Sequence, residues 1–241
     1  MLPAFSVVIP CFNEAARIGG TIGATLEYLE KNSPQSELVV VNDGSTDQTS
    51  TAAREALSRS ALQSRLLENF PNRGKGHAVR KGLLAAQQPI GLFFDADLST
   101  PLSEVPKVIE PIVAGDVDLA FGSRALDRRL IGRHQPWTRE HGGRIFNLLV
   151  RLSSGLPFWD TQCGFKAFRL NVCRPILEAA RLEGFAFDVE LLMLAQRAGL
   201  RLREIPVRWD HSEGSKVHFL YDSLRMLREV IALRSQSPSI S

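Results

Sequence analysis

The chain has 241 residues, of which 44% are apolar, so it is long enough and apolar enough to bury a hydrophobic core. Its net charge of +3 is too small to indicate a nucleic-acid partner, and its three cysteines are too few for a disulfide framework. No apolar run approaches the ~20 residues of a membrane-spanning helix, and the amino terminus lacks the features of a signal peptide. We therefore expect a cytoplasmic protein without nucleic acid as a partner, which can still bind the inner face of a membrane.

In the first half of the chain, short apolar runs alternate with segments of helical periodicity. Strands are predicted at residues 5–10, 38–41, 65–67, 90–94 and 117–121, and helices at 14–31, from about 47, at 76–87 and after Pro101. This alternation is typical of an α/β fold, Rossmann-like, with a mostly parallel sheet flanked by helices on both faces. Ligands bind such sheets at the carboxyl ends of the strands. The sequence places four polar clusters there, at Asn13–Glu14, Asp43, Asp95–Asp97 and Ser123–Arg124.

The second half is less regular. Helices are predicted at 139–152, 187–198 and 219–233, a strand at 202–207, and a disordered polar tail at 235–241. We expect residues 1–234 to form a single domain.

The predicted helix 139–152 carries an apolar stripe beside arginines. The stripe consists of Ile145, Leu148, Leu149 and Leu152. From Arg124 to Arg151 the chain has seven arginines against two acidic residues. An anionic membrane surface attracts such a basic stretch, and also the last predicted helix, 219–233. Ordinary surface helices that pack on the sheet show the same pattern. The sequence leaves both interpretations open.

Two aspartates directly follow the buried strand 90–94. In an extended chain the side chains of Asp95 and Asp97 point to the same side, where two unpaired carboxylates repel each other. A divalent cation with oxygen ligands, Mg²⁺ or Mn²⁺ together with phosphates, would relieve this repulsion. Two aspartates one residue apart also occur in ordinary solvated turns. The buried strand in front of them favours the metal site.

The segment 42–47 follows the second predicted strand. Ser45 or Thr46 can cap the next helix, a task that does not need Asp43. A carboxylate at this point can accept a hydrogen bond from the imide nitrogen of uracil or from the amino group of guanine. Phe12, close to the proline that ends the first strand, is either a stacking partner for the base or a core aromatic.

Two glycines flank Lys75 where a helix is predicted to begin. Glycines let a backbone approach a phosphate or a base closely, and a helix start attracts anions. The spacing is not that of a P-loop, so this segment by itself is a weak indication.

Several segments of this chain occur in a characteristic order. Those of the first half are Val7–Glu14, Val41–Asp47, Asn72–Gly76, Asp95–Pro101 and Gly122–Arg124. Together they resemble the inverting family 2 glycosyltransferases with the GT-A fold. Later segments narrow the resemblance to dolichyl-phosphate β-glucosyltransferases, and they are Asp160–Lys166, Phe187–Glu190, Glu204–Trp209 and Glu213–Lys216. The resemblance extends from about Phe5 to Leu233.

The resemblance implies a UDP-sugar donor, with glucose favoured, bound mainly by residues 1–124. Asp95 and Asp97 would bind the metal that bridges the diphosphate, and Ser99 stands where relatives that use mannose donors carry a metal-contacting glutamine. The residues implied to hold the base, ribose or diphosphate are Pro10, Phe12, Glu14, Asp43, Lys75 and Asp95. Phe12 replaces a tyrosine that is common in the mannosyl relatives.

The resemblance also implies a polyprenyl or dolichyl phosphate as acceptor, bound by residues 125–234 and by Arg124. The cations implied to hold its phosphate are Arg124, Arg139, Arg144 and Lys216. A lipid phosphate is already an anion, so transfer needs no general base, and Asp97, Arg124 and Lys216 would be the catalytic residues. The eukaryotic relatives resembled carry an amino-terminal membrane anchor that we do not find here. An integral-membrane partner is one way to hold the chain at the membrane.

Other functions make different demands on the sequence. If the acceptor were a hydroxyl, a carboxylate base would be required, and Asp188 and Glu190 are the candidates. A protein that only binds nucleotide-sugars would be expected to lose Asp97 or Lys216, and both are present. A dinucleotide-dependent oxidoreductase would need a glycine-rich fingerprint after the first strand, where this chain has none.

Overall fold

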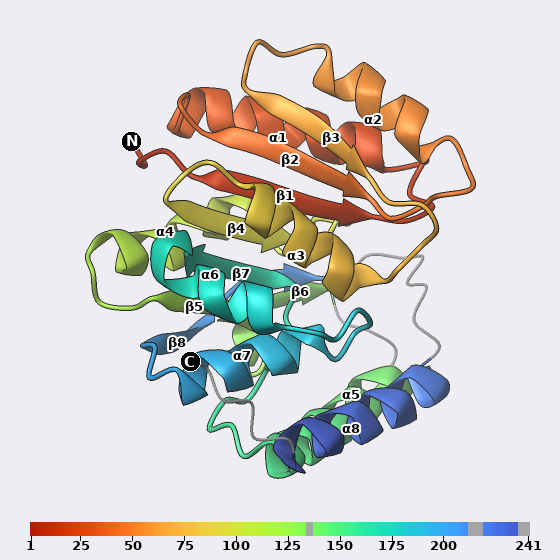
Figure 1. Cartoon of the computed structure of the whole chain (residues 1–241), viewed down its shortest axis with the longest axis vertical. Coiled ribbons are helices and arrows are strands. Elements are labelled where there is room, and N and C mark those ends of the chain that lie inside the picture. Colours follow the sequence, from red (N-terminus) through yellow and green to blue (C-terminus); the bar gives the residue numbers. More distant parts are fainter. Residues whose placement is uncertain (134–136, 212–218, 236–241) are drawn as a thin grey trace.

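The computed structural model describes residues 1–133, 137–211 and 219–235 (Figure 1). Its centre is a seven-stranded sheet in the order β3-β2-β1-β4-β7-β5-β8. These strands are β1 (Ser6–Cys11), β2 (Glu37–Asn42), β3 (Ser64–Glu68), β4 (Ile90–Phe94), β5 (Leu119–Ser123), β7 (Phe165–Arg169) and β8 (Leu202–Pro206). All neighbours are parallel except β7, which runs antiparallel to β4 and β5. The predicted mostly parallel sheet is confirmed, but β7 was not predicted.

Helices cover both faces of this sheet. One face is covered by α1 (Ile18–Asn32), α2 (Thr49–Leu57) and α4 (Val105–Val113), and the other by α3 (Lys75–Ala85), α6 (Leu170–Ala179) and α7 (Phe187–Arg197). Along β1, Val7 and Ile9 pack into the first of these layers and Val8 into the second. This alternation is expected of a strand that is buried on both faces.

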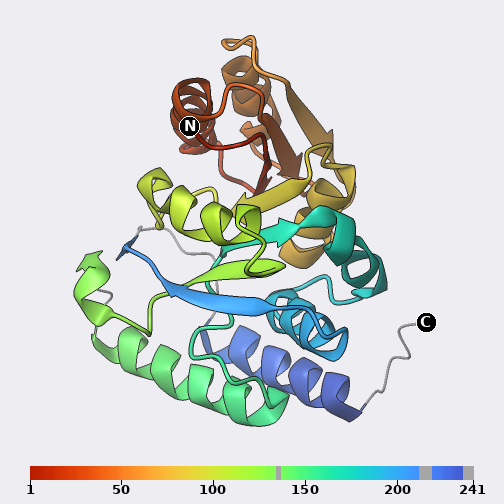
Figure 2. The same ribbon diagram turned by 90° about the vertical axis from the view of Figure 1, so that its left-hand side faces the viewer.

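Two long helices lie side by side at one end of the molecule, α5 (Trp137–Ser154) and α8 (Phe219–Ser235) (Figures 1 and 2). Each follows a strand of a small parallel sheet formed by β6 (Ile131–Arg133) and β9 (Trp209–Asp210). Short 3₁₀ turns, η1 (Leu102–Glu104) and η2 (Arg128–Leu130), precede α4 and β6. Helix α8 includes Ser235, which the sequence assigned to the tail, and residues 236–241 lie outside the described part.

Two boundaries at the start of the chain differ from the prediction for physical reasons. Strand β1 continues past Pro10, since its ladder with β4 ends at Val8 and the missing N–H of the proline breaks no pairing there. Helix α1 begins at Ile18 and not at Glu14, because side chains of the loop between β2 and α2, and of the first residue of α2, hold the preceding residues in a loop. The N–H of Glu14, for example, donates to Thr49 Oγ (2.7 Å).

Candidate active site

The loops after β1 and β2 interlock at the carboxyl edge of the sheet. The N–H of Asn13 donates to Ser45 Oγ (2.8 Å), and the N–H of Thr46 donates to Asn13 Oδ1 (2.8 Å). Asn13 has a φ of +53°, a left-handed conformation that asparagine tolerates better than most residues. The neighbouring Phe12 is 37% exposed, so it is not a core aromatic. Its position is compatible with the predicted stacking on a base.

Asp43, at the end of β2, is buried and fully engaged by the loop that precedes α3. Its carboxylate accepts hydrogen bonds from the side-chain amides of Asn69 (2.7 Å) and Asn72 (2.9 Å). It also accepts from the backbone N–H groups of Arg73 (3.2 Å) and Gly74 (2.6 Å). The visible task of Asp43 is therefore to fold this loop against β2. Its predicted contact with a base would require one of these donors to move.

The glycines on either side of Lys75 allow a close approach within the protein. Gly74 has a φ of +111°, and a Cβ atom there would lie 2.4 Å from the carbonyl oxygen of Glu183. A Cβ atom on Gly76 would lie 2.5 Å from Phe187 Cβ. The N–H of Gly76 donates to the carbonyl of Glu183 (2.8 Å). The start of α3 is thus pressed against the segment that leads into α7, which fixes the position of Lys75.

Asp95 stands at the end of β4 with Lys75 as its counter-ion. Lys75 Nζ lies 2.5 Å from Asp95 Oδ1, and the two side chains are 20% and 38% exposed. Burial by itself lowers the pKa of Lys75, but the charges of Asp95 and Asp188 outweigh it and raise the pKa above its usual value. On the other side, a Cβ atom on Gly164 would lie 2.1 Å from Asp95 Oδ2. The glycine leaves the room that this carboxylate occupies.

Asp97 lies in the turn that follows, and this turn is braced. Thr21 Oγ of α1 donates to the carbonyl of Ala96 (2.6 Å), and the N–H of Ser99 donates to Asp97 Oδ1 (2.9 Å). The carbonyl of Ser99 accepts from the N–H of Asp210 in β9 (2.8 Å). The small sheet is therefore attached directly to the aspartate turn.

The two carboxylates suit a hard divalent cation, because Mg²⁺ and Mn²⁺ take oxygen ligands. The ion pair of Asp95 with Lys75 shows that this position binds a positive partner. In the described ranges, no group of three His, Cys, Asp or Glu side chains could hold an ion by itself. A metal at Asp95 and Asp97 would therefore need further oxygen ligands, such as those of a diphosphate. The assignment of Asp95, Asp97 and Ser99 as metal ligands stays a prediction.

Arg124, at the end of β5, is held by a bidentate ion pair with Asp160. Its Nε and Nη2 atoms lie 2.7 and 2.8 Å from the Asp160 oxygens, and its backbone N–H also donates to Asp160 (2.9 Å). Burial by itself raises the pKa of Asp160, but the charge and hydrogen bonds of Arg124 outweigh it and lower the pKa. The guanidinium lies 5.7 Å from the centre of the Trp209 ring, and its side chain remains 31% exposed. Arg124 is thus a rigidly placed cation with N–H groups left for a ligand.

The sequence of residues 6–177, well over half of the chain, matches the family described as Glycosyl transferase family 2. The chain belongs to this family. It is 34% identical to the dolichyl-phosphate beta-glucosyltransferase of Saccharomyces cerevisiae, over 95% of this chain and 73% of that protein. It is 36% identical to the protein of the same name from Drosophila melanogaster, again over 95% and 73% of the two chains.

Solved structures of glucosyl-3-phosphoglycerate synthase from Mycobacterium tuberculosis are similar to this family 2 glycosyltransferase. One has a TM-score of 0.70 at 21% identity and covers 98% of this chain and 82% of its own. Another, in complex with Mn²⁺, UDP and glucosyl-3-phosphoglycerate, has a TM-score of 0.67 at 23% identity, with coverages of 96% and 78%. At these identities the likeness establishes the fold alone, and it confirms the GT-A fold. Across the described part of the glycosyltransferase, no helix has the length and apolar content that a bilayer-spanning segment requires.

The two candidate bases of this glycosyltransferase have structural partners. Asp188 Oδ1 lies 2.6 Å from Lys166 Nζ, and the side chains are 4% and 0% exposed. The carboxylate of Glu190 accepts from the backbone N–H groups of Arg181 (2.9 Å) and Leu182 (2.8 Å). Both carboxylates are committed to pairing and to holding the segment before α7. These contacts speak against their use as a base.

Three of the predicted acceptor-binding cations cannot be placed. Lys216 lies in the segment 212–218, outside the described residues. Arg139 and Arg144 belong to α5, but their side chains are also outside the described part. Of the predicted acceptor site, the structure therefore places Arg124 alone.

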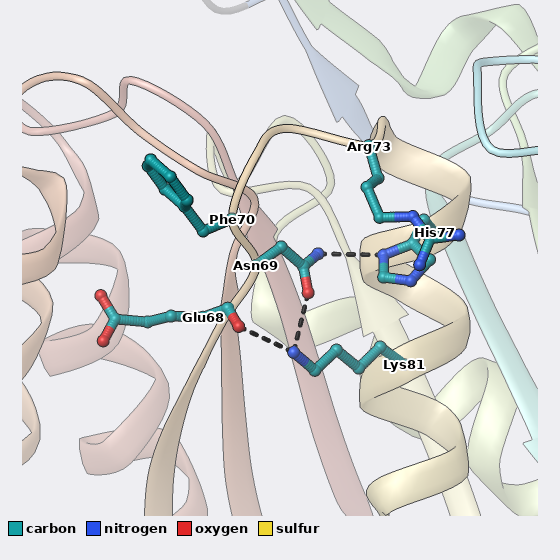
Figure 3. Close-up of a pocket in the computed structure, with 6 residues that line it drawn as sticks. All are labelled: Glu68, Asn69, Phe70, Arg73, His77 and Lys81. Atoms are coloured by element: carbon teal, nitrogen blue, oxygen red, sulfur yellow. Dashed lines mark hydrogen bonds between the residues drawn. The ribbon is translucent and has the colours of Figure 1, made fainter.

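A pocket of about 310 Å³ lies between the end of β3, the loop that follows it and the first turns of α3, and the sequence did not indicate it (Figure 3). It is lined by Glu68, Asn69, Phe70, Arg73, His77 and Lys81. Burial and the charge of Arg73 lower the pKa of His77, whose Nδ1 faces the amide of Asn69 (3.0 Å). Lys81 Nζ donates to Asn69 Oδ1 (2.7 Å). Because Asn69 also donates to Asp43 (2.7 Å), these pocket residues help to hold the loop before α3 against the end of β2.

Sequence reasoning missed the roles of three residues in the segment 160–166. Asp160 orients Arg124, Gly164 makes room for Asp95, and Lys166 neutralises Asp188. The segment contributed to the family resemblance, but their partners are all distant in the chain. A lysine inside the apolar run of β7 was the one local sign of a buried ion pair.

Proposed function

We propose that this glycosyltransferase transfers a sugar, with glucose favoured, from a UDP-sugar to a polyprenyl or dolichyl phosphate at the cytoplasmic face of a membrane, with inversion at the anomeric carbon. The observation that carries the proposal is that two groups lie at the carboxyl edge of the sheet. One is the turn with Asp95 and Asp97, where Lys75 pairs with Asp95, and the other is Arg124, which an ion pair holds at the end of β5. Relatives at 34% and 36% identity that are named dolichyl-phosphate beta-glucosyltransferases support this choice of acceptor.

On the donor side, Phe12 stacks on the base while Pro10, Glu14 and Asp43 shape its site and that of the ribose. Asp95 and Asp97, close to Ser99, would hold Mg²⁺ or Mn²⁺, which would supply positive charge to stabilise the departing nucleoside diphosphate. Lys75 adds a second positive charge next to Asp95. The solved structure of glucosyl-3-phosphoglycerate synthase in complex with Mn²⁺ and UDP supports the combination of a divalent metal with a uridine nucleotide in this fold.

On the acceptor side, Arg124 positions the lipid phosphate together with Lys216, Arg139 and Arg144. An arginine held by a buried carboxylate cannot swing away, and its remaining N–H groups keep a fixed direction. The phosphate oxygen attacks as an anion, so no proton has to be removed. In this scheme residues 1–124 bind the nucleotide-sugar and residues 125–234 bind the acceptor. An integral-membrane partner could add to the membrane attachment.

A matched pair of acceptors tests the proposal. The purified protein is given UDP- or GDP-sugars with either a polyprenyl phosphate or the corresponding polyprenol, and release of nucleoside diphosphate is measured with Mg²⁺, with Mn²⁺ and with EDTA. We expect turnover with a UDP-sugar, the lipid phosphate and metal only, and a β-linked product from UDP-glucose by NMR. Transfer to the free polyprenol at an equal rate would refute the phosphate acceptor, and full activity in EDTA would refute the metal.

A further inference from the structure

Helix α5 presents its apolar stripe to the outside of the protein. Four residues at helical spacing form this stripe, and their exposed fractions are Ile145 63%, Leu148 52%, Leu149 42% and Leu152 65%. The opposite side of the helix faces the core through the fully buried Val150 and the partly buried Phe146. Among the two interpretations that the sequence allowed, packing of the stripe on the sheet is therefore wrong.

A contiguous exposed apolar patch of this kind marks an interaction site in a folded protein. Its surroundings are cationic and aromatic. The guanidinium of Arg151 lies 4.0 Å from the centre of the Trp159 ring, and Trp159 is 54% exposed. Arg234 of α8 donates to the carbonyl of Leu152 (3.2 Å) at the end of the stripe. Tryptophan and arginine are the residue types that lie at the boundary between lipid tails and headgroups.

The charge of helices α5 and α8 indicates which partner covers the apolar stripe. Helices α5 and α8 together contain six arginines against three acidic residues, Glu140, Asp222 and Glu229. An anionic lipid surface complements this excess. A second copy of the chain would bring an equally cationic surface against it, because a two-fold interface pairs a patch with itself.

The helix pair is also connected to the candidate site. Helices α5 and α8 each follow a strand of the small sheet formed by β6 and β9. In that sheet Asp210 bonds the carbonyl of Ser99, and Trp209 lies beside Arg124. The helix that carries the stripe is thus linked along the chain to the small sheet that contacts the aspartate turn and Arg124.

We infer that the stripe Ile145, Leu148, Leu149 and Leu152 of α5, with Arg151, Trp159 and Arg234 at its border, is a docking surface that enters the headgroup region of an anionic bilayer. The inference deepens the proposed function, on which it rests for the identity of the lipid acceptor. It adds which face of the protein meets the lipid. Docking does not require nucleotide, metal or turnover.

Binding to vesicles tests this surface without any catalysis. The full chain is sedimented with vesicles of phosphatidylcholine alone or of phosphatidylcholine with about 30% phosphatidylglycerol. Wild type should bind the anionic vesicles, and binding should weaken as salt is raised. Leu148→Ser/Leu152→Ser should bind at least about tenfold more weakly, because two large apolar side chains no longer leave water. Val113→Ser serves as the control, since Val113 is 52% exposed on α4, far from the stripe in sequence, and should bind like wild type.

Urea unfolding and analytical ultracentrifugation distinguish loss of membrane docking from misfolding and from dimer formation. Both variants should keep wild-type unfolding midpoints in urea, since the altered side chains are exposed. Equal vesicle binding by Leu148→Ser/Leu152→Ser and wild type would overturn the inference. So would a dimer in analytical ultracentrifugation that dissociates in this variant while vesicle binding persists. If the protein binds vesicles through the stripe but transfers no sugar to lipid phosphate, the proposed function fails and the docking surface stands.

Discussion

Replacing Lys75 by methionine should change the affinities for metal and for nucleotide in opposite directions. In the structure Lys75 Nζ lies 2.5 Å from Asp95 Oδ1, so the lysine holds the carboxylate that we assign to the metal. Without this cation, Asp95 and Asp97 repel each other and attract a divalent ion more strongly. A diphosphate that arrives afterwards meets one positive charge fewer.

The short distance between Lys75 and Asp95 sets the size of the expected change in Mn²⁺ affinity. Two unit charges 4 Å apart interact by about 4 kcal/mol at an effective dielectric constant of about 20. Asp95 is 38% exposed, and solvent screening reduces the effect on a competing ion to about 1–2 kcal/mol. Mn²⁺ should therefore bind Lys75→Met about 5–30-fold more tightly than wild type when no nucleotide is present. UDP in the presence of Mn²⁺ should bind about tenfold more weakly.

Electron paramagnetic resonance of free Mn²⁺ measures the first affinity, and calorimetry with UDP the second. Lys75→Arg keeps the charge and should resemble wild type in both. Lys81→Met, on the same helix, removes an amine that bonds Asn69 and the carbonyl of Glu68, and it should leave Mn²⁺ affinity unchanged. Equal or weaker Mn²⁺ binding by Lys75→Met would show that the lysine does not compete with the metal at Asp95.

Three further predictions follow from buried contacts. Lys166→Met should lower the free energy of unfolding in urea by about 3–5 kcal/mol, and adding Asp188→Asn should restore much of it, because the uncompensated buried charge is then removed. A loss below about 1 kcal/mol would contradict a buried pair. Gly164→Ala should abolish turnover and weaken Mn²⁺ binding, since its Cβ atom would lie 2.1 Å from a carboxylate oxygen of Asp95; unchanged Mn²⁺ affinity would count against that position. Hydrogen bonds from Arg201 lower the pKa of Asp118. The ionised carboxylate therefore adds to the free energy of unfolding above about pH 4, which is the pKa of an aspartate in the unfolded chain, and this stabilisation is lost as the pH falls through the pKa in the folded protein. The urea midpoint of the wild-type protein should fall in that acidic range, and the midpoint of Asp118→Asn should fall less over the same pH change.

The regular elements could be predicted because they depend on local patterns. Strand β4 was predicted with the bounds it has in the structure, Ile90–Phe94, since five consecutive apolar residues end abruptly at an aspartate. The parallel sheet followed from the alternation of strands and helices. Strand β7 was not predicted because it is short and contains the charged Lys166. It pairs with β4 and β5, which lie far away in the chain.

The site shows the same division between local and distant information. Composition and order of the motifs singled out Asp95, Asp97, Lys75 and Arg124 and the family to which the chain belongs. How the loops meet decides two further contacts, the ion pair of Lys75 with Asp95 and the bidentate ion pair of Arg124 with the distant Asp160. No local pattern encodes such contacts.

The apolar stripe of α5 makes this division plain. The sequence alone determined that Ile145, Leu148, Leu149 and Leu152 share one face of a helix, because a period of 3.6 residues places them there. Whether that face turns to the sheet or to the outside was decided by tertiary structure. Phe146 and Val150 contact the core, and a helix that buries them must expose the stripe.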